Sequence, residues 1–285
     1  MRRALLFAVL SSCYAAPAAP VVTLTFAVDA PPSSEIYECY AFDAGSFENR
    51  WVKSIAWTAP APGAVVLHHA TLYAVSDWSQ GDVSTCWDMP AAAAGLHVWA
   101  PGGDALTVPD DMGIELPPGA TKLVVQVHAI RIGDGPATEG SVTLTTTDAR
   151  PARVAAWRPM SAPIPALRPH MIDTSTAACT AGGDFRVIRD WPHMHLAGKE
   201  LHGAVLHQDG TTTPLVDVVP WDFYAQKTYD VDVAVGAGDQ VQTHCVWENP
   251  TDNYIFAGPK TTDEMCNQSL LAWPAASAFW TGDCP

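Results

Sequence analysis

The sequence predicts an all-β fold made of two antiparallel β-sandwich domains. Of its 285 residues, 48% are hydrophobic and only 16% are charged, which is enough apolar material to bury a core. The 24 prolines and 20 glycines indicate many turns. Short runs of Val, Thr, Leu and aromatic residues recur between these turn signals, and no long helical periodicity interrupts them. Regular short strands of this kind favour β-sandwiches.

The first 20 residues (1–20) predict an export signal rather than part of the fold. Two arginines precede the apolar run 4–10, and small residues and prolines follow it. A run this short cannot span a bilayer as a permanent anchor. The letters LSSC, which end at Cys13, also resemble a bacterial lipoprotein box, in which that cysteine is acylated. We therefore expect a secreted, periplasmic or lipid-anchored protein that touches a membrane only through an anchor at Cys13.

Nine segments carry the strand signal, and a stretch rich in proline and arginine divides them into two groups. The first group is 21–28, 65–75, 122–130 and 140–147, and the second is 185–191, 200–207, 229–235, 239–248 and 264–273. The dividing stretch is 148–169, so we expect a domain boundary near residue 150. The expected domains are 21–150 and 151–285.

The cysteines indicate disulfides formed in an oxidising compartment. With Cys13 set aside, six remain: Cys39, Cys86, Cys179, Cys245, Cys266 and Cys284. They are dispersed and form no CxxC pair, which favours three disulfides over a metal site. Six cysteines allow many pairings, so the residues alone leave the pairing open. The net charge of −15 excludes nucleic acid and anionic membrane surfaces as partners, because both would repel the chain.

The segment WPHMHLAGKEL, residues 191–201, places His193 and His195 two residues apart. Residues i and i+2 of an extended strand face the same side, so both imidazoles can reach one ion while Met194 points away. Two hydrogen-bonded surface histidines would give the same spacing. The motif therefore suggests a metal site without establishing one.

A second cluster is the pair His68 and His69, and a third histidine, His128, lies on a predicted strand. Neighbours in a regular strand face opposite ways, so the pair can share an ion only at a bulge or a strand end. No Asp or Glu lies within two residues of these three histidines, which argues against a zinc hydrolase. Imidazole combined with thioether suits copper that cycles through Cu(I), and Met265 offers a thioether.

Taken in order, the segments VVLHHATLYA, QVHAI, WPHMHLAGKEL and HCVWENPTDN…TTDEMCNQS resemble the copper type II, ascorbate-dependent monooxygenases. That family includes the peptidylglycine α-hydroxylating and dopamine β-hydroxylating enzymes, and the resemblance covers about residues 35–285. It implies two jelly-roll-like β-sandwich domains that each hold one copper and face each other across an open cleft. It also implies the disulfides Cys39–Cys86, Cys179–Cys284 and Cys245–Cys266.

The resemblance further implies two copper ions, with one ligand set in each domain. The first set is His68, His69 and His128, and the second is His193, His195 and Met265. The implied reaction is hydroxylation of an activated C–H bond of a small organic substrate by O2 at the second copper. Ascorbate or another one-electron donor would supply electrons, and the first copper would hold one of them. Gln126 matches a family glutamine that orients water near the first copper.

Departures from the family pattern concern the substrate. The peptide-amidating branch holds a substrate carboxylate with an arginine, a tyrosine and an asparagine, and here those positions are Trp191, Ser269 and Asn267. Only the asparagine survives, so peptidylglycine is not the expected substrate. Trp191 offers an aromatic face for an apolar group or a cation, although a tryptophan packed beside the site would look the same.

Two other readings remain open on the sequence. A non-catalytic copper-binding or copper-carrying protein could keep this fold, although one site would then be enough. A zinc-dependent hydrolase is the third reading, and turnover without a reductant would indicate it. The remaining histidines have no predicted role; they are His97, His170, His202, His207 and His244.

Overall fold

The computed structural model describes residues 20–29, 35–45, 50–58, 65–86, 94–116, 119–134, 137–275, 279–281 and 284. The expected export signal and Cys13 lie outside these residues, so both remain predictions. Within the described ranges the protein is all-β, which confirms the predicted class. No helix in this part of the chain is long and apolar enough to cross a membrane.

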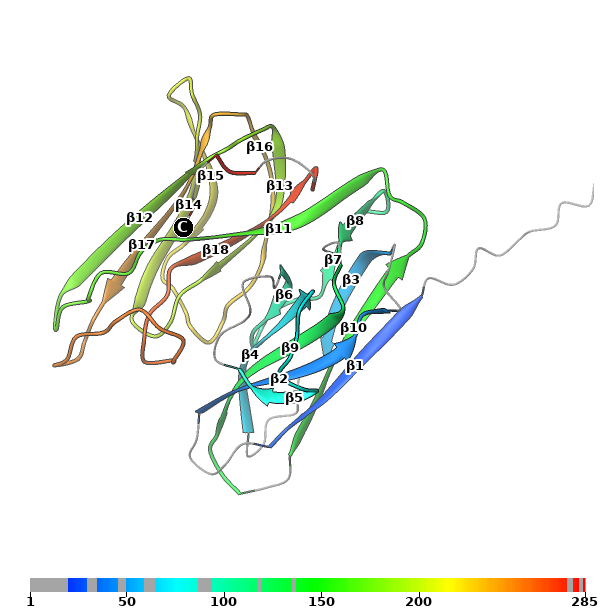
Figure 1. Ribbon diagram of the computed structural model, residues 1–285. Helices are drawn as coiled ribbons and strands as arrows, with labels where there is room; N and C mark the ends of the chain where they lie inside the picture. The colour runs from blue at the N-terminus through cyan, green and yellow to red at the C-terminus, as the bar shows by residue number, and fades with distance from the viewer. Residues whose placement is uncertain are drawn as a thin grey trace, which may run out of the picture.

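Eighteen strands are present among the described residues (Figure 1). In chain order they are β1 (Val21–Val28), β2 (Glu35–Asp43), β3 (Trp51–Thr58), β4 (Val65–Val75), β5 (Val83–Thr85), β6 (Ala94–Trp99), β7 (Leu106–Thr107), β8 (Met112–Glu115), β9 (Lys122–Arg131), β10 (Thr138–Thr147), β11 (Arg153–Ser161), β12 (Ile172–Thr180), β13 (Phe185–His193), β14 (Gly198–Leu206), β15 (Thr212–Val218), β16 (Tyr229–Val235), β17 (Gln240–Glu248) and β18 (Asn267–Trp273).

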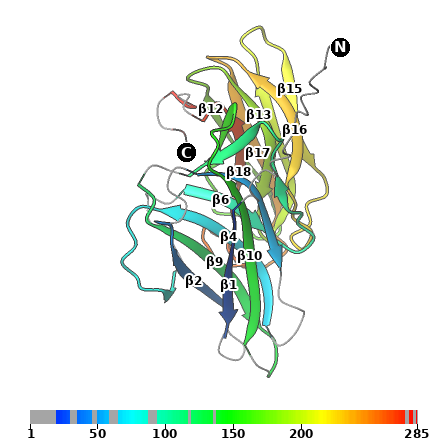
Figure 2. The same cartoon turned by 90° about the vertical axis from the view of Figure 1, so that its right-hand side faces the viewer.

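The strands form three sheets. A nine-stranded sheet has the order β1-β10-β3-β8-β11-β18-β13-β16, with β7 paired to β3. A five-stranded sheet, β5-β2-β9-β4-β6, packs on the N-terminal part of it, and a four-stranded sheet, β12-β17-β14-β15, packs on the C-terminal part. Figures 1 and 2 show the resulting two halves, one above the other. The fold is therefore two layers deep in each half, as expected for β-sandwiches.

Strand β11 joins the two halves into one sheet. It pairs in parallel with β8 through Arg153, Val154 and Ala155, and antiparallel with β18 over Ala156–Ser161. The sequence suggested only a junction over 148–169, because proline weakens a strand signal. Pro159 is tolerated because β8 pairs only with the first three residues of β11. The division into 21–150 and 151–285 remains a prediction beside this continuous sheet.

Each half has its own hydrophobic core and its own disulfides. One core packs β1, β3 and β10 against β4 and β9, and two smaller cores pack β13 and β18 against β14 and β17. The disulfides join Cys39 to Cys86, Cys179 to Cys284 and Cys245 to Cys266, which confirms the three implied pairings. His69 and His193 meet where the two halves face each other.

Candidate metal centre

His68 and His69 lie on β4 where its pairing with β9 shifts register. Leu67 pairs with Ala129 and His69 pairs with His128, so His68 is the extra residue of a β-bulge. The bulge turns both neighbouring imidazoles toward His128, whose ring centroid lies 5.0 Å from that of His68 and 4.9 Å from that of His69. This agrees with the expectation that two neighbouring histidines can share an ion only at a bulge or a strand end.

The three rings each leave one nitrogen without a partner. Nδ1 of His68, His69 and His128 is buried and accepts or donates no hydrogen bond within the described part of the chain. The Nε2 of His128 lies 2.6 Å from Oε1 of Glu35, which can only accept when ionised. Nε2 of His128 therefore carries the proton, and its Nδ1 presents a lone pair. An unpaired buried polar atom costs about 1–3 kcal/mol, which a bound metal ion would offset.

A second pair of imidazoles lies at the end of β13. His193 is the last residue of the strand, His195 follows it, and their ring centroids are 5.0 Å apart. Met194 between them is fully buried in the core of the C-terminal half, as the strand alternation predicts. The HxH spacing thus brings both rings to one place.

Hydrogen bonds orient both rings of this pair. His193 Nδ1 lies 2.7 Å from Oε1 of Gln226, whose amide is fixed because its Nε2 donates to the carbonyl of Phe223 at 3.0 Å. His195 Nδ1 lies 3.1 Å from the carbonyl oxygen of Asp263. Both acceptors force the proton onto Nδ1, so Nε2 of each ring presents a lone pair. The Nε2 of His195 is buried and has no partner among the described residues.

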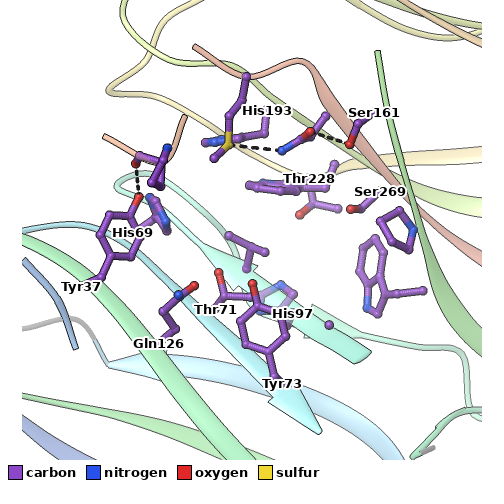
Figure 3. Close-up of a pocket in the computed structure, with 18 of the residues that line it drawn as sticks. Tyr37, His69, Thr71, Tyr73, His97, Gln126, Ser161, His193, Thr228 and Ser269 are labelled. Atoms are coloured by element: carbon purple, nitrogen blue, oxygen red, sulfur yellow. Dashed lines mark hydrogen bonds between the residues drawn. The ribbon is translucent and has the colours of Figure 1, made fainter. Parts of the chain in front are cut away.

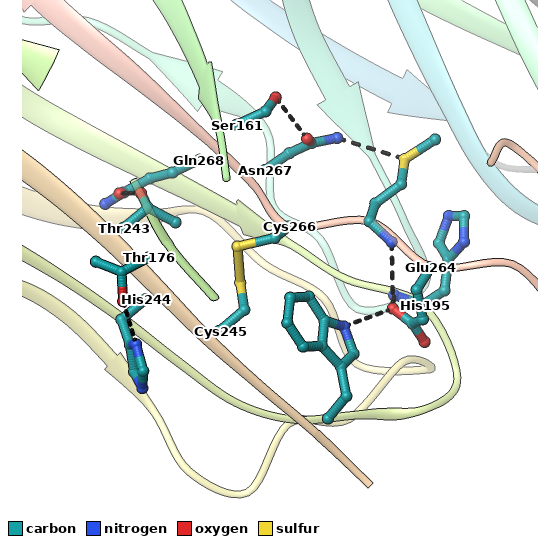
Figure 4. Close-up of a disulfide and its surroundings, with 12 residues drawn as sticks. Ser161, Thr176, His195, Thr243, His244, Cys245, Glu264, Cys266, Asn267 and Gln268 are labelled. Atoms are coloured by element: carbon teal, nitrogen blue, oxygen red, sulfur yellow. Dashed lines mark hydrogen bonds between the residues drawn. A yellow bond between two sulfur atoms is a disulfide. The ribbon is translucent and has the colours of Figure 1, made fainter. Parts of the chain in front are cut away.

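Met265 lies in the connection before β18, and its thioether is held by Asn267. Nδ2 of Asn267 donates to Met265 Sδ at 3.4 Å, and Oδ1 of Asn267 accepts from Ser161 Oγ at 2.7 Å (Figure 4). The adjacent Cys266 is tied to Cys245 on β17. The methionine is therefore fixed by a side-chain hydrogen bond and by a disulfide at the next residue.

Glu264 connects the methionine segment to the histidine segment. Its Oε2 accepts from the backbone N–H groups of His195 (3.0 Å) and Met265 (3.2 Å) and from Trp247 Nε1 (3.0 Å). Its Oε1 accepts from the backbone N–H of Ala197 at 2.6 Å. Burial raises the pKa of Glu264 to about 7, while the four donors favour the ionised form. Sequence reasoning missed both Glu264 and Gln226, because no motif marks either residue.

The two histidine groups touch each other instead of facing across an open cleft. The ring centroids of His69 and His193 are 5.8 Å apart. Phe223 packs against both groups, with centroid distances of 5.5 Å to His68 and 6.1 Å to His195. The resemblance implies two groups that are separated by an open cleft. In this structure, contacts between the two halves hold the groups together.

Two hydrogen-bonded contacts bridge the halves beside the histidines. Glu35 Oε1, which binds His128, also accepts from the backbone N–H of Thr261 at 2.9 Å. The hydroxyl of Tyr37 donates to the carbonyl of Pro259 at 2.6 Å, and its ring stacks on His128 at 4.2 Å. The segment that precedes Met265 is thus attached to the strand that supports the first histidine group.

Burial sets the protonation of the histidines. It lowers the pKa of His128 to about 4 and that of His193 to about 3, in each case as the largest cause. It also lowers the pKa of His68, His69 and His195. These imidazoles are therefore neutral near pH 7, which is the form that binds a metal ion.

A cavity of about 480 Å³ opens beside these groups, between the facing sheets of the two halves (Figure 3). His69, His193 and Met265 line one end of it.

The predicted residues Gln126, Trp191 and Asn267 also line the cavity. Trp191 stacks on His193, with ring centroids 5.0 Å apart and planes inclined by 15°. Gln126 is buried, and its Nε2 donates to the carbonyl of Cys86 at 2.8 Å. Their roles toward water and substrate remain predictions.

The donor set fits copper better than zinc. Within the described ranges no group of three or more His, Cys, Asp and Glu side chains is arranged so that it could hold a metal ion. In the N-terminal half, the structure provides the Nδ1 atoms of His68, His69 and His128. In the C-terminal half, it provides the Nε2 atoms of His193 and His195 and the thioether of Met265. Imidazole and thioether without carboxylate or thiolate are ligands that suit copper in both oxidation states.

Four of the histidines without a predicted role have polar partners of their own. They are His170 with Asp252, His202 with Asp217, His207 with Asp239, and His244 with Thr176. The fifth, His97, lines the cavity. Sequence reasoning missed it, because a single histidine on a strand carries no signal.

Comparison with known proteins finds a family similarity in the C-terminal part of the chain. Residues 171–280 match the family model described as copper type II ascorbate-dependent monooxygenase, C-terminal domain. A human protein named "Putative DBH-like monooxygenase protein 2" is 34% identical over 86 residues, which are 29% of this chain and 17% of that protein. The match thus spans less than a fifth of the length of this relative.

Among solved structures, the similarities are remote. The major capsid protein P2 of bacteriophage PM2 matches over 90% of this chain and 100% of its own, with 12% identity and a TM-score of 0.33. A Sulfolobus turreted icosahedral virus structure matches over 90% of both chains, with 9% identity and a TM-score of 0.34. Similarities with TM-scores this low carry no argument about function.

Proposed function

We propose that the chain is a dicopper monooxygenase of the copper type II ascorbate-dependent family, because residues 171–280 match the model of the C-terminal domain of that family. The proposed reaction converts a substrate C–H bond, O2, two electrons and two protons into a C–OH group and water. Ascorbate or another one-electron donor supplies the electrons. Copper, when bound, supplies the reversible one-electron chemistry that O2 activation needs.

One observation carries the proposal: four buried imidazole nitrogens have no partner in the described structure. They are Nδ1 of His68, His69 and His128, and Nε2 of His195. Nearly all buried polar groups in proteins are hydrogen-bonded, so four exceptions in one place call for a missing ligand. In the proposal His68, His69 and His128 hold one copper, and His193, His195 and Met265 hold the other.

The remaining residues of the site orient these ligands. Glu35, Gln226 and the carbonyl of Asp263 fix the tautomers of His128, His193 and His195. Glu264 holds the backbone of His195 and Met265. The cavity beside Met265 admits the substrate, and Gln126 orients water there. Trp191 and Asn267 border the space in which the reacting C–H bond would lie.

The activity can be tested before the natural substrate is known. The probes are 3-phenylpropanoate, 3-phenylpropan-1-amine and 3-phenylpropanamide, which are anionic, cationic and neutral. Each is incubated with copper-loaded protein, ascorbate and ¹⁸O2, and products are analysed by mass spectrometry. We expect an ¹⁸O-labelled alcohol from at least one probe, and its loss in His193→Ala, with the first copper retained. Labelled alcohol at the normal rate from His193→Ala would contradict the site assignment.

The copper-carrier alternative predicts a different result. A carrier would bind copper in the same place but give no labelled product from any probe and no probe-dependent O2 consumption. The contact between His69 and His193 favours the enzyme, because two adjacent sites allow electron transfer between them and a carrier needs only one site.

We also propose that the protein works outside the cytoplasm, in the periplasm or beyond the cell, with a lipid anchor at Cys13 if that residue is acylated. The three disulfides support this location, because disulfides persist in oxidising compartments.

A further inference from the structure

We infer that the cavity beside Met265 binds an uncharged organic substrate that carries a hydrogen-bond acceptor at the end remote from the histidines. Trp157 and His97 would donate to that acceptor. This inference rests on the proposed function, because it concerns the substrate of the same site. It adds the chemical class of the molecule and two residues to which neither the family resemblance nor the predicted site assigns a role.

The cavity is elongated along the strands. Ser161, Pro159 and Trp157 alternate along β11 and all line it, as do His69, Thr71 and Tyr73 along β4. Ser161 is hydrogen-bonded to Asn267 beside Met265, whereas Trp157 pairs with Leu271 four residues farther along β18. Four residues of a strand span about 13 Å. Trp157 therefore marks the end of the cavity away from the histidine groups.

His97 lies at the same remote end and acts as a hydrogen-bond donor. It is buried on β6, beside Leu72 on β4, and it lines the cavity. Its Nδ1 accepts a hydrogen bond from Trp57 Nε1 at 2.8 Å, and an indole N–H can only donate. The proton of His97 is therefore on Nε2, and no described residue accepts it. Burial lowers the pKa of His97 to about 3, which agrees with a neutral ring.

Trp157 supplies a second donor. Its ring lines the cavity, whereas its Nε1 is covered in the described structure and has no hydrogen-bond partner there; in our inference a small shift of the ring on ligand binding brings this N–H to the ligand. Two N–H donors at one end of a cavity match a carbonyl, amide or ether oxygen. A ligand oxygen there would satisfy donors that the folded chain leaves unpaired.

The described lining of the cavity contains no Asp, Glu, Lys or Arg. Its polar atoms come from hydroxyl, amide, indole and neutral imidazole groups, as Figure 3 shows for the labelled side chains. At the end of the cavity remote from the histidines, a carboxylate or ammonium group would lose its hydration and would meet no side chain of opposite charge. A volume of about 480 Å³ suits a small organic molecule. The lining thus selects a neutral ligand.

Binding can be measured without turnover. The copper-loaded protein is kept as Cu(I) in the absence of O2, so that the charged probes gain little by binding the metal, and is titrated by calorimetry with 3-phenylpropanamide, 3-phenylpropanoate, 3-phenylpropan-1-amine and n-propylbenzene. We expect the amide to bind at least tenfold more tightly than either charged probe. Equal or tighter binding of a charged probe, or no binding of the amide, would overturn the inference.

Two tryptophan variants locate the acceptor. Trp157→Phe keeps an aromatic ring but removes the indole N–H, so we expect about tenfold weaker amide binding, as for one lost buried hydrogen bond. Binding of n-propylbenzene, which has no acceptor, should not change. Trp273→Phe is the matched control, because its Nε1 is also buried and unpartnered in the described structure but does not line the cavity. Equal amide affinities in the two variants would overturn the role of Trp157.

The outcomes separate this inference from the proposed function. Selective amide binding without ¹⁸O-labelled product would sustain the pocket and reject the monooxygenase. Labelled product from only the anionic or the cationic probe would sustain the monooxygenase and reject the neutral pocket.

Discussion

The two histidine groups are held by different means. In the first group, the backbone sets the positions of the rings, because a bulge on β4 turns His68 and His69 toward His128 on the neighbouring strand. Nε2 of His128 lies 2.6 Å from Oε1 of Glu35 and 3.4 Å from Oγ1 of Thr261. The second group depends on side chains from distant segments. Gln226, Asp263, Glu264 and Asn267 each orient a ligand, and none of them lies on β13.

This contrast shows where each group is vulnerable. A ligand set fixed by strand register tolerates changes in its surroundings, because the register is set by hydrogen bonds along the whole strand. A set fixed by side-chain hydrogen bonds can be loosened by a single substitution outside the ligands. We therefore expect substitutions around the second group to affect one copper and leave the other in place.

The largest effect should come from Glu264→Gln. The amide keeps the size of the side chain, but one of its two acceptor positions becomes an NH2 group that faces backbone N–H donors. We expect a loss of roughly 2–3 kcal/mol in the free energy of unfolding. We also expect loss of the second copper, because the donors on His195 and Met265 are affected. Urea denaturation and copper analysis measure both.

Glu248→Gln is the matched control for Glu264. Glu248 forms an exposed ion pair with Lys199, and such pairs contribute at most about 1 kcal/mol. Its replacement should leave the copper content unchanged. If Glu264→Gln behaves like Glu248→Gln, the carboxylate does not connect the histidine and methionine segments in the way described.

A smaller effect is expected for Gln226→Ala. The substitution removes the acceptor of His193 Nδ1–H and frees the ring to rotate. Loss of such a partner typically weakens metal binding by about 10–100-fold, and we expect this for the second copper only. Competition with a Cu(I) chelator measures the affinity. Gln208→Ala, in an exposed turn, serves as control, and equal weakening of both coppers would contradict the independence of the two groups.

The smallest effect is expected for Glu35→Gln. The amide oxygen can still accept from His128 and from Thr261, so only the charge is lost. In Glu35→Gln the copper affinity of the first group should fall less than about tenfold. In Glu35→Ala it should fall by about 10–100-fold, because only the longer 3.4 Å contact of His128 Nε2 with Thr261 Oγ1 remains. Competition with the same Cu(I) chelator distinguishes Glu35→Gln from Glu35→Ala. Identical affinities for the two variants would show that Glu35 does not orient His128.

Nine of the eighteen described strands were predicted from the sequence. The strands that were not predicted are β2, β3, β5, β6, β7, β8, β11, β12 and β15. The predicted runs 21–28, 65–75 and 229–235 coincide with β1, β4 and β16, because each carries β-branched residues between turn signals. β11 was missed because its arginines and Pro159 are typical of a linker. β2 and β3 were also not predicted; the sequence analysis gave no expectation for them.

The sequence predicted which histidines lie close together, but it did not predict their surroundings. The HxH and HH spacings, together with the bulge condition, indicated that these histidines gather in the same region. The contact between His69 and His193 was not predicted, because it depends on how the two halves pack. The roles of Gln226 and Glu264 were not predictable either, since a histidine partner comes from whichever loop passes it in the fold. Whether the histidines and Met265 bind copper remains a prediction.

The most direct test of the central claim is the copper content per chain after copper loading and removal of loosely bound metal with a chelator. We expect two tightly held copper ions in the native protein and one in His193→Ala. A single copper in the native protein, or zinc bound in preference to copper, would contradict the proposed dicopper site.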